Sequence, residues 1–392
     1  MTSTPPALPA SLAHLGTFPP TQCGLATFGA ALLDAMSVLQ PSRRVGVIDV
    51  VDQPRPLPLR AGAQLVNSQS TSIASCADFI ADHDALVLEH EFGIFGGPDG
   101  DDVLQLLDRV RVPVMSVLHT VPAAPTCHQQ VVLEQVAAAS GAVVVMSNAA
   151  RDRLSCGYRI DPSTLHVVPH GARVNPQRSD ERHGLHRPTV LTWGLLGPGK
   201  GIEQAIDAMV KVRSIIPLPR YVIAGQTHPK VLASSGESYR NELRARVHRL
   251  GLDDVVEFDD EYRDLDSLAA LVRRADVVLL PYENREQVTS GVLVEAIASE
   301  RPVVATAFPH ARELLSGGAG FLVDHGDVDA LGTAVAQILT RPRLAESMQL
   351  RARRIAATLA WPAVAARYGE LVDHLVVSMA PRHTENAAVR VA

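Results

Sequence analysis

Residues 287–306 read QVTSGVLVEAIASERPVVAT, in which a polar loop leads into a short apolar helix and then into a strand that follows a proline. The same alternation of helix and strand runs through the whole chain. Continuously apolar, β-branched runs stand at 44–51, 85–91, 112–119, 142–147, 165–171, 189–194, 220–225, 255–260, 276–282, 302–306 and 320–324. Such runs are typical of parallel strands that helices cover on both faces. The sequence therefore predicts an α/β protein with doubly wound parallel sheets.

The chain is long enough for two domains, because it has 392 residues and a single core stops growing at roughly 250–300 residues. The pattern changes at 172–188, a polar and basic stretch with proline and glycine that is typical of a linker. Two such domains in tandem leave a cleft between them. We expect Rossmann-like domains at 1–175 and 176–360, a helix at 361–378 and a disordered tail at 379–392.

Composition disfavours several classes of partner. With 36 Lys+Arg against 42 Asp+Glu, the net charge is -6, and no run of five basic residues is present to follow a nucleic acid backbone. The four cysteines are far apart and match no zinc motif, which favours free thiols and a cytoplasmic location. No uninterrupted apolar stretch reaches the ~18 residues of a membrane span, so we expect membrane contact to be peripheral at most.

The helix of the opening stretch begins at a place suited to an anion. Thr289 or Ser290 is placed to cap it, and a capped helix leaves its first backbone N–H groups without intrahelical partners. These are the N–H groups of Gly291, Val292 and Leu293. Glycine lets an anion approach the backbone, and the helix dipole adds partial positive charge. This stretch therefore predicts a phosphate site.

Glu295 lies about one turn deeper in the same helix, among apolar neighbours. A capping box would need the acid three residues after Ser290, at Leu293, so the spacing disfavours that structural role. A carboxylate at this depth can accept two hydrogen bonds from a vicinal diol, as acids do for ribose in other α/β domains. An ordinary ion pair with a neighbouring arginine is the alternative.

A second loop, WGLLGPGKGIEQAI at 193–206, joins a strand to a helix that begins near Gly201. Lys200 in this loop can place a positive charge on a phosphate, and a solvent-facing lysine is the alternative. The loop is not the phosphate loop of nucleotide hydrolases, because the glycine spacing differs and no Ser or Thr follows the lysine.

Polar residues also end strands of the first domain. The segment SVLHTVP places His119 at the carboxyl end of a parallel strand, which is the edge where open α/β sheets bind ligands. The segment LEHEFGIFGG ends another strand at Glu89, His90 and Glu91. Because alternate side chains on a strand point apart, we expect these three to line an acceptor site and not to hold a metal ion.

The Lys200 loop and the 287–306 segment, in this order, resemble the retaining glycosyltransferases of family 4, which have the GT-B fold. The resemblance runs from about Gly24 to Val377, and it implies that residues 361–378 cross back to complete the first domain. It implies a catalytic set of His119, Lys200 and Glu295. It further implies a donor-phosphate set of Gly24, Gly194, Lys200, Ser290, Gly291, Val292 and Glu295, a sugar or acceptor set of Gln287, Thr289, Glu89, His90 and Glu91, and a base and ribose set of Gly225, Gln226 and Thr227.

The sequence departs from the family pattern at two positions. The family usually has an acid where Gln287 stands, and an arginine where Leu195 follows the glycine of the first strand. One of two cations for the donor diphosphate is therefore missing. Arg285 and Arg173 are candidates for replacing it.

We expect the protein to transfer a mannose-type or glucose-type hexose from a nucleotide-diphosphate sugar to a hydroxyl of a carbohydrate, small-molecule or lipid-linked acceptor. The family resemblance implies retention of configuration and no metal ion or cofactor, with Lys200 and the helix dipole neutralising the leaving diphosphate. Two alternatives remain open: a glycoside phosphorylase that uses phosphate or a sugar 1-phosphate, and a non-catalytic subunit that binds nucleotide sugars. The base, the sugar, the acceptor and the oligomeric state are not determined by the sequence.

Overall fold

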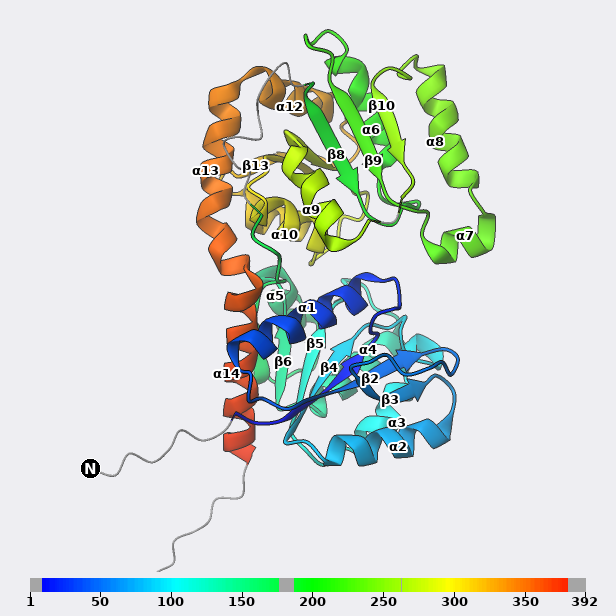
Figure 1. The fold of residues 1–392 in the computed structure, drawn as a ribbon, viewed down its shortest axis with the longest axis vertical. Helices are drawn as coiled ribbons and strands as arrows, with labels where there is room; N and C mark the ends of the chain where they lie inside the picture. The colour runs from blue at the N-terminus through cyan, green and yellow to red at the C-terminus, as the bar shows by residue number, and fades with distance from the viewer. Residues whose placement is uncertain (1–8, 176–186, 262, 380–392) are drawn as a thin grey trace, which may run out of the picture.

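The computed structural model describes residues 9–175, 187–261 and 263–379, and it contains two parallel sheets, one above the other in Figure 1. The predicted α/β class is confirmed. Residues 176–186 of the expected linker and residues 380–392 of the expected tail lie outside the described ranges. Met379, the first residue of that tail, is instead the last residue of a helix.

The first sheet has seven parallel strands in the order β3-β2-β1-β4-β5-β6-β7. They are β1 (Leu12–Gly16), β2 (Val45–Val51), β3 (Ala61–Val66), β4 (Ala85–His90), β5 (Val114–Leu118), β6 (Ala142–Val145) and β7 (Leu165–Val167). The sequence predicted every strand except β1 and β3. The apolar pattern of β1 is interrupted by His14 and follows a proline-rich start, and β3 is an edge strand with one largely half-buried face, so neither has a long apolar run.

Helices cover both faces of this sheet and form a separate core on each. The helices are α1 (Gly24–Leu39), α2 (Ser70–Ala81), α3 (Asp102–Leu107), α4 (Cys127–Ala138) and α5 (Asn148–Gly157). The side chains of α2 to α5 form one core, whereas α1 shares the other with α14 (Trp361–Met379), the last helix of the described chain. Phe28 of α1 and Tyr368 of α14 are buried there, and burial of an apolar side chain such as Phe28 stabilises the fold by roughly 1.5–3 kcal/mol.

The second sheet has six parallel strands in the order β10-β9-β8-β11-β12-β13, all at predicted places. They are β8 (Thr189–Trp193), β9 (Arg220–Ala224), β10 (Val256–Asp259), β11 (Val277–Leu280), β12 (Val303–Thr306) and β13 (Gly320–Val323). Its helices are α6 (Ile202–Ala208), α7 (Pro229–Ser235), α8 (Ser238–Arg249), α9 (Leu265–Arg274), α10 (Gly291–Ala298), α11 (Pro309–Leu315), α12 (Val328–Thr340) and α13 (Pro342–Leu359). The helix predicted to begin near Gly201 is α6 followed by a 3-10 turn at Met209–Val212.

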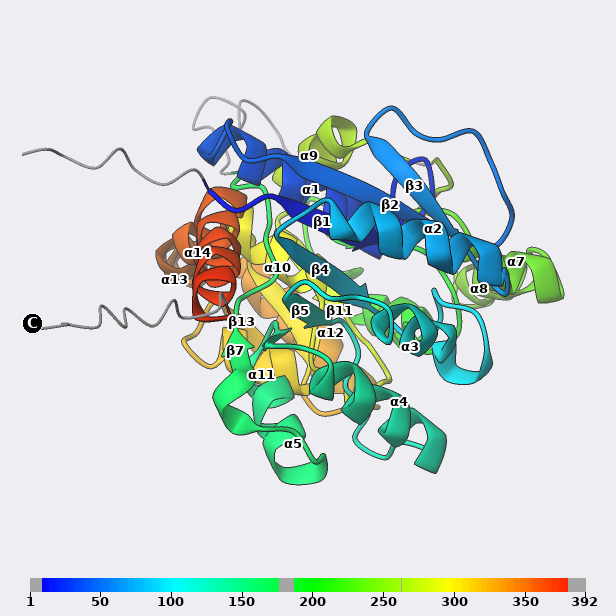
Figure 2. The ribbon, with the colours of Figure 1, turned by 90° about the horizontal axis from the view of Figure 1, so that it is seen from below.

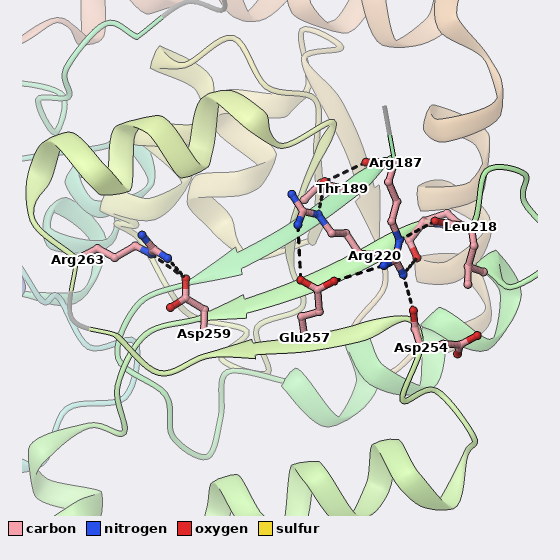
Figure 3. A network of polar contacts seen from close by, with 9 residues as sticks. Arg187, Thr189, Leu218, Arg220, Asp254, Glu257, Asp259 and Arg263 are labelled. Atoms are coloured by element: carbon pink, nitrogen blue, oxygen red, sulfur yellow. Dashed lines mark hydrogen bonds and ion pairs between the residues drawn. The ribbon is translucent and has the colours of Figure 1, made fainter. Parts of the chain in front are cut away.

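Polar side chains join the amino-terminal ends of the first three strands of this sheet (Figure 3). Glu257 on β10 lies 3.5 Å from Arg187 and 3.6 Å from Arg220, and the Nε of Arg220 donates to the Thr189 hydroxyl at 2.9 Å. Because ligands bind at the opposite, carboxyl edge of such sheets, this network belongs to the scaffold.

The chain crosses between the two sheets twice, and the two crossings lie side by side. The backbone N–H of Ala172 donates to Leu359 O at 2.8 Å, and that of Trp361 donates to Ala172 O at 3.1 Å. At Gly171 a Cβ would lie only 2.2 Å from the Trp361 ring, so glycine is needed for this close approach. Helices α13 and α14 then run along one side of the molecule, as Figure 1 and Figure 2 show. We call residues 170–175 and 359–361 the hinge.

None of the described helices is long and apolar enough to cross a lipid bilayer. All four cysteines are unpaired thiols, as the sequence predicted. Within the described ranges, no three His, Cys, Asp or Glu side chains are grouped so that they could hold a metal ion.

Candidate active site

Each sheet has a switch point where the strand order reverses, between β1 and β4 in the first and between β8 and β11 in the second. Open α/β sheets bind ligands at the carboxyl ends of the strands beside such a point. The ends of β4 and β5 carry Glu89, His90 and His119, and the ends of β8 and β11 carry Gly194 and Tyr282. Contacts between the domains bring these two edges together.

We call these contacts the interdomain clamp. Val288 of the second domain is buried in the core of the first, and the Ser147 hydroxyl donates to its carbonyl oxygen at 2.7 Å. The guanidinium of Arg153 donates to the backbone and the carboxylate of Glu286 at 2.9 and 2.7 Å. The carboxylate of Glu313 accepts hydrogen bonds from the first backbone N–H groups of α5 at 3.1 and 3.3 Å. The clamp therefore fixes the 284–290 loop against the first domain.

The predicted cap of α10 is present and involves Ser290. Its hydroxyl accepts a hydrogen bond from the Leu293 N–H at 3.3 Å, so the prediction that this N–H is free was wrong. The N–H groups of Gly291 and Val292 make no hydrogen bond with described residues. The hydroxyl of Thr289 is buried and also lacks a partner within the described chain. Three polar groups at this helix start thus remain available to a ligand.

The reason for glycine at position 291 differs from the predicted one. A Cβ there would lie 2.9 Å from Nε2 of His170 in the hinge, so Gly291 makes room for an imidazole and not only for an anion. Burial lowers the pKa of His170 to about 4, so the ring is neutral at neutral pH. Its Nδ1 lies 2.7 Å from Gly171 O and must carry the hydrogen, which leaves Nε2 as an acceptor beside the helix start. This ring therefore adds no positive charge for a phosphate.

Glu295 is held by an indole and not by an arginine. The Trp193 Nε1–H donates to its carboxylate at 3.3 Å, and no arginine or lysine of the described chain forms an ion pair with it. Burial raises the pKa of Glu295 to about 7, although the Trp193 hydrogen bond lowers it. A buried acid that titrates near neutral pH is typical of a functional site.

Lys200 does not face solvent, which the sequence left open. Its Nζ lies 4.8 Å from the centre of the Tyr282 ring, and burial lowers its pKa. The loop is held close to β11, because a Cβ on Gly201 would lie 1.8 Å from Pro281 O and its φ is +66°. A cation fixed at the β8/β11 switch point is suited to an anionic ligand.

The loop after β9 packs against the Gly194 turn. Gly225 has φ +128°, and a Cβ there would lie 2.1 Å from Gly194 O. The Thr227 hydroxyl donates to the Glu237 carboxylate, so this predicted base contact is already engaged within the protein. Gln226 is exposed, and its backbone oxygen accepts from Leu196 at 2.8 Å. Of the three residues predicted for the base, only the Gln226 side chain is open.

Across the junction, the end of β5 brings His119 against Glu89 of β4. The Nε2 of His119 lies 2.6 Å from the Glu89 carboxylate, which is also 3.3 Å from Nε2 of His14 on β1. Glu89 is only 1% exposed, so the expectation that it lines an acceptor surface was wrong. It faces inward because β4 is the central strand beside β1 and its alternate side chains are all covered.

His90 and Glu91 also differ from the expectation. His90 is fully buried against Phe92 and Phe95, and burial lowers its pKa to about 3, so it belongs to the core. Glu91 is partly exposed, and its carboxylate accepts a hydrogen bond from Thr120. Only Glu91 of the three therefore reaches the outer surface.

The start of α1 contributes Phe28 more clearly than Gly24. Gly24 is exposed, and a Cβ there would touch nothing within 4 Å, so no close approach requires glycine. The Phe28 ring lies 5.0 Å from the rings of both His119 and His170. Phe28 thereby links the first domain's switch point to the hinge.

The two candidates for the missing cation are in different situations. Arg173 forms an ion pair with Asp266. Arg285 follows β11 and makes no hydrogen bond or ion pair within the described chain. Burial lowers the pKa of His325 most, and the positive charge of Arg285 is the second largest cause of that lowering. The Gln287 side chain donates to Thr289 O at 3.0 Å. Arg285 is therefore the available replacement.

Reasoning from the sequence missed His14, Phe28, His170 and Trp193. Trp193 directly precedes Gly194 at a predicted strand end, so the strand-end rule would have found it. His14 stands in the unpredicted β1, and no local signal marks the side of α1 or of the hinge that faces the site.

Comparisons with known proteins agree with this architecture. The profile of the family described as Glycosyl transferases group 1 matches residues 187–341. A GDP-mannose-dependent alpha-(1-6)-phosphatidylinositol monomannoside mannosyltransferase from Mycolicibacterium smegmatis is 30% identical over 246 residues, which are 59% of this chain and 62% of that protein. A D-inositol 3-phosphate glycosyltransferase from Xylanimonas cellulosilytica is 32% identical over 242 residues, which are 56% of this chain and 55% of the relative. The match thus spans about three fifths of the length of these relatives.

Solved structures support the fold over almost the whole chain. Anabaena HepE in complex with UDP and glucose superposes with a TM-score of 0.73 and 17% identity, and the match covers 93% of this chain and 100% of that one. WaaG, a glycosyltransferase involved in lipopolysaccharide biosynthesis, superposes with a TM-score of 0.65 and 14% identity over 92% of this chain and 99% of that one. Residues 187–341 therefore match the glycosyl transferases group 1 family, and the chain as a whole has the GT-B fold.

Proposed function

We propose that the protein is a retaining glycosyltransferase that moves a hexose from a nucleotide-diphosphate sugar to a hydroxyl acceptor. The observation that carries this proposal is the convergence of Lys200, Glu295 and the free N–H groups of α10 beside one switch point, within the segment that matches the family. The names of the relatives and the nucleotide bound in a structural neighbour support the same class of reaction.

The donor would be held mainly by the second domain. The N–H groups of Gly291 and Val292 would bind the diphosphate, and Lys200 would add a positive charge. The Glu295 carboxylate would accept hydrogen bonds from both hydroxyls of the ribose. His119 would face the sugar from the first domain, where its ring is 10% exposed.

Charge stabilisation at the leaving group would drive the reaction. The α10 dipole and Lys200 supply positive charge where the diphosphate oxygen gains negative charge, which supports transfer without a metal ion. Glu89 is buried between two histidines and is not placed to attack the sugar as a nucleophile. The acceptor oxygen would bond to the anomeric carbon on the face from which the diphosphate leaves, the bond between that carbon and the diphosphate oxygen would break, and the hydroxyl proton would pass to the leaving phosphate, so that the configuration is retained.

Calorimetric titration with UDP-, GDP- and ADP-sugars tests the donor assignment. One nucleotide sugar is expected to bind wild type tightly. The Glu295→Ala substitution is expected to lower its affinity roughly 10- to 100-fold, because two hydrogen bonds to a carboxylate contribute about 1.5–3 kcal/mol. Glu257→Ala, on the scaffold edge of the same domain, is the matched control and should bind normally. Equal affinity in wild type and Glu295→Ala would contradict the role of Glu295.

The same titrations separate the alternatives. Stabilisation by phosphate or a sugar 1-phosphate, with no nucleotide binding, would favour a glycoside phosphorylase, a reading that Leu195 in place of the usual arginine keeps open. Nucleotide-sugar binding without turnover would favour a non-catalytic subunit. The acceptor search would start from inositol phosphates and phosphatidylinositol mannosides, the compounds in the relatives' names.

A further inference from the structure

A buried carboxylate stands behind the histidine that faces the site. Glu89 Oε2 lies 2.6 Å from Nε2 of His119, and its Oε1 lies 3.3 Å from Nε2 of His14. Two glycines make room for this group: a Cβ on Gly16 would lie 3.0 Å from the Glu89 Cβ, and a Cβ on Gly29 would lie 2.8 Å from the His14 ring. The surrounding backbone is therefore built to hold the carboxylate between two imidazoles.

The charge of this cluster follows from its hydrogen bonds. Burial raises the pKa of Glu89, but the hydrogen bonds from His119 and His14, together with the electrostatic attraction of the two rings, outweigh burial and lower it to about 2. An ionised carboxylate only accepts hydrogen bonds, so the Nε2 atoms of both histidines must carry hydrogens. Whenever the His119 ring is neutral with its hydrogen on Nε2, Nδ1 is a bare acceptor.

The exposed side of His119 is the side of Nδ1. The Nε2 atom is engaged with Glu89, whereas Nδ1 makes no hydrogen bond with any described residue. The Nδ1 atom is not fully enclosed by atoms of the described chain, so it belongs to the exposed part of the ring. The edge of Phe28 packs against the ring at 5.0 Å and limits its rotation.

Beyond His119 and His14, the neighbouring titratable groups add no charge to the cluster. Burial lowers the pKa of His90 to about 3 and that of His170 to about 4, so both are neutral at neutral pH. Burial and then the charge of Glu89 raise the pKa of Tyr368 on α14, which keeps its hydroxyl protonated, although the charge of Arg367 lowers it. None of these three groups thus competes with the Glu89 carboxylate for His119.

We propose that Glu89 is a positioning residue, which fixes His119 in the Nε2-protonated tautomer so that Nδ1 accepts a hydrogen bond from a hydroxyl of the transferred sugar. The sugar part of this inference rests on the proposed function, and the tautomer part does not. A site built to accept a hydrogen bond from a hydroxyl rejects the deoxy analogue strongly, because the buried acceptor is then left unpaired.

Nitrogen NMR of protein labelled with 15N-histidine tests the tautomer directly, and the His119 signals are assigned by their loss in His119→Asn. In wild type at pH 7.5 we expect the pattern of an Nε2-protonated ring, and in Glu89→Gln a mixture of tautomers, because an amide can both donate and accept. Asp99→Asn is the matched control, since Asp99 holds the exposed His128 at 3.0 Å. An Nδ1-protonated His119 in wild type would overturn the proposal, even if Glu89→Gln failed to fold.

Kinetics then test the consequence for the sugar. Glu89→Gln is expected to lower kcat 10- to 100-fold with little change in donor KM, and to lose most of the wild-type preference for the complete sugar over its deoxy analogues. A purely structural role predicts lower thermal stability with unchanged kcat and unchanged preference, which would contradict the proposal. Because the NMR result needs no donor, it holds or fails independently of the proposed glycosyl transfer.

Discussion

The raised pKa of Glu295 predicts that ionisation of this acid destabilises the fold as the pH rises. Raising the pKa from 4.5 to about 7 means that the unfolded chain ionises first as the pH increases. Between these values the unfolded state binds fewer protons, so the free energy of unfolding falls as the pH rises from about 4.5 to about 7. The full difference corresponds to about 3 kcal/mol. Glu295→Gln removes the titration and should be more stable than wild type above pH 7.

Donor binding should depend on pH in the opposite sense. Both ribose hydroxyls can donate hydrogen bonds to the ionised carboxylate, so the nucleotide sugar would bind preferentially to the protein with Glu295 ionised. At pH 6 the Glu295 carboxyl group would therefore lose close to one proton when the nucleotide sugar binds. Affinity should then rise roughly tenfold between pH 6 and pH 8 for wild type and stay level for Glu295→Gln.

Calorimetry in buffers of different ionisation enthalpy measures the proton release, and urea unfolding at pH 5 and pH 8 measures stability. A nucleotide sugar is the suitable ligand, because its esterified diphosphate does not titrate in this range. Glu257→Gln, from the scaffold network in Figure 3, should follow wild type in donor affinity. Parallel pH profiles for wild type and Glu295→Gln would refute the reasoning.

Three further predictions concern other parts of the molecule. Lys200→Met should lower the affinity for a nucleotide sugar about 10- to 100-fold in calorimetry, because a charged contact of about 1.5–3 kcal/mol is lost. An equal loss of affinity for the phosphate-free nucleoside would argue against a contact with phosphate. Gly171→Ala should destabilise the fold by about 1–3 kcal/mol in urea unfolding, because the new Cβ meets the Trp361 ring, whereas Gly157→Ala, with no atom within 4 Å, should stay within about 1 kcal/mol of wild type. Arg153→Met removes a contact of the interdomain clamp, so the 284–290 loop should exchange its amide hydrogens faster in mass spectrometry; unchanged exchange would mean that the buried valine of this loop holds the domains together without the arginine.

The fold was predictable wherever the strands are buried on both faces. The runs at β6 and β11 are continuously apolar because helices cover them above and below, so local sequence was sufficient. Strand β1 lies in the interior of the first sheet, but its apolar pattern is interrupted by His14, whose Nε2 pairs with an acid on the neighbouring strand. The pairing that allows a histidine in a central strand is not visible in the segment itself.

The site was predictable as a set of strand ends and helix starts, but not as a set of contacts. His119, Lys200 and Glu295 lie at the edges that the strand-end rule indicates. Their partners come from distant parts of the chain: the indole that holds Glu295 is 102 residues away. Position along an element tells which edge a residue occupies, whereas the partner at that edge depends on how the two sheets meet.

The return of α14 to the first domain has a consequence for how the protein is made on the ribosome. The first sheet and α1 are synthesised long before α14, yet the buried faces of Leu12 and Phe28 share their core with it. The second domain lies between them in the sequence and carries its own two cores, so it can complete its packing first. One face of the first sheet therefore stays uncovered until α14 is made, whereas the core on its other face consists almost entirely of residues of the first domain and can pack earlier.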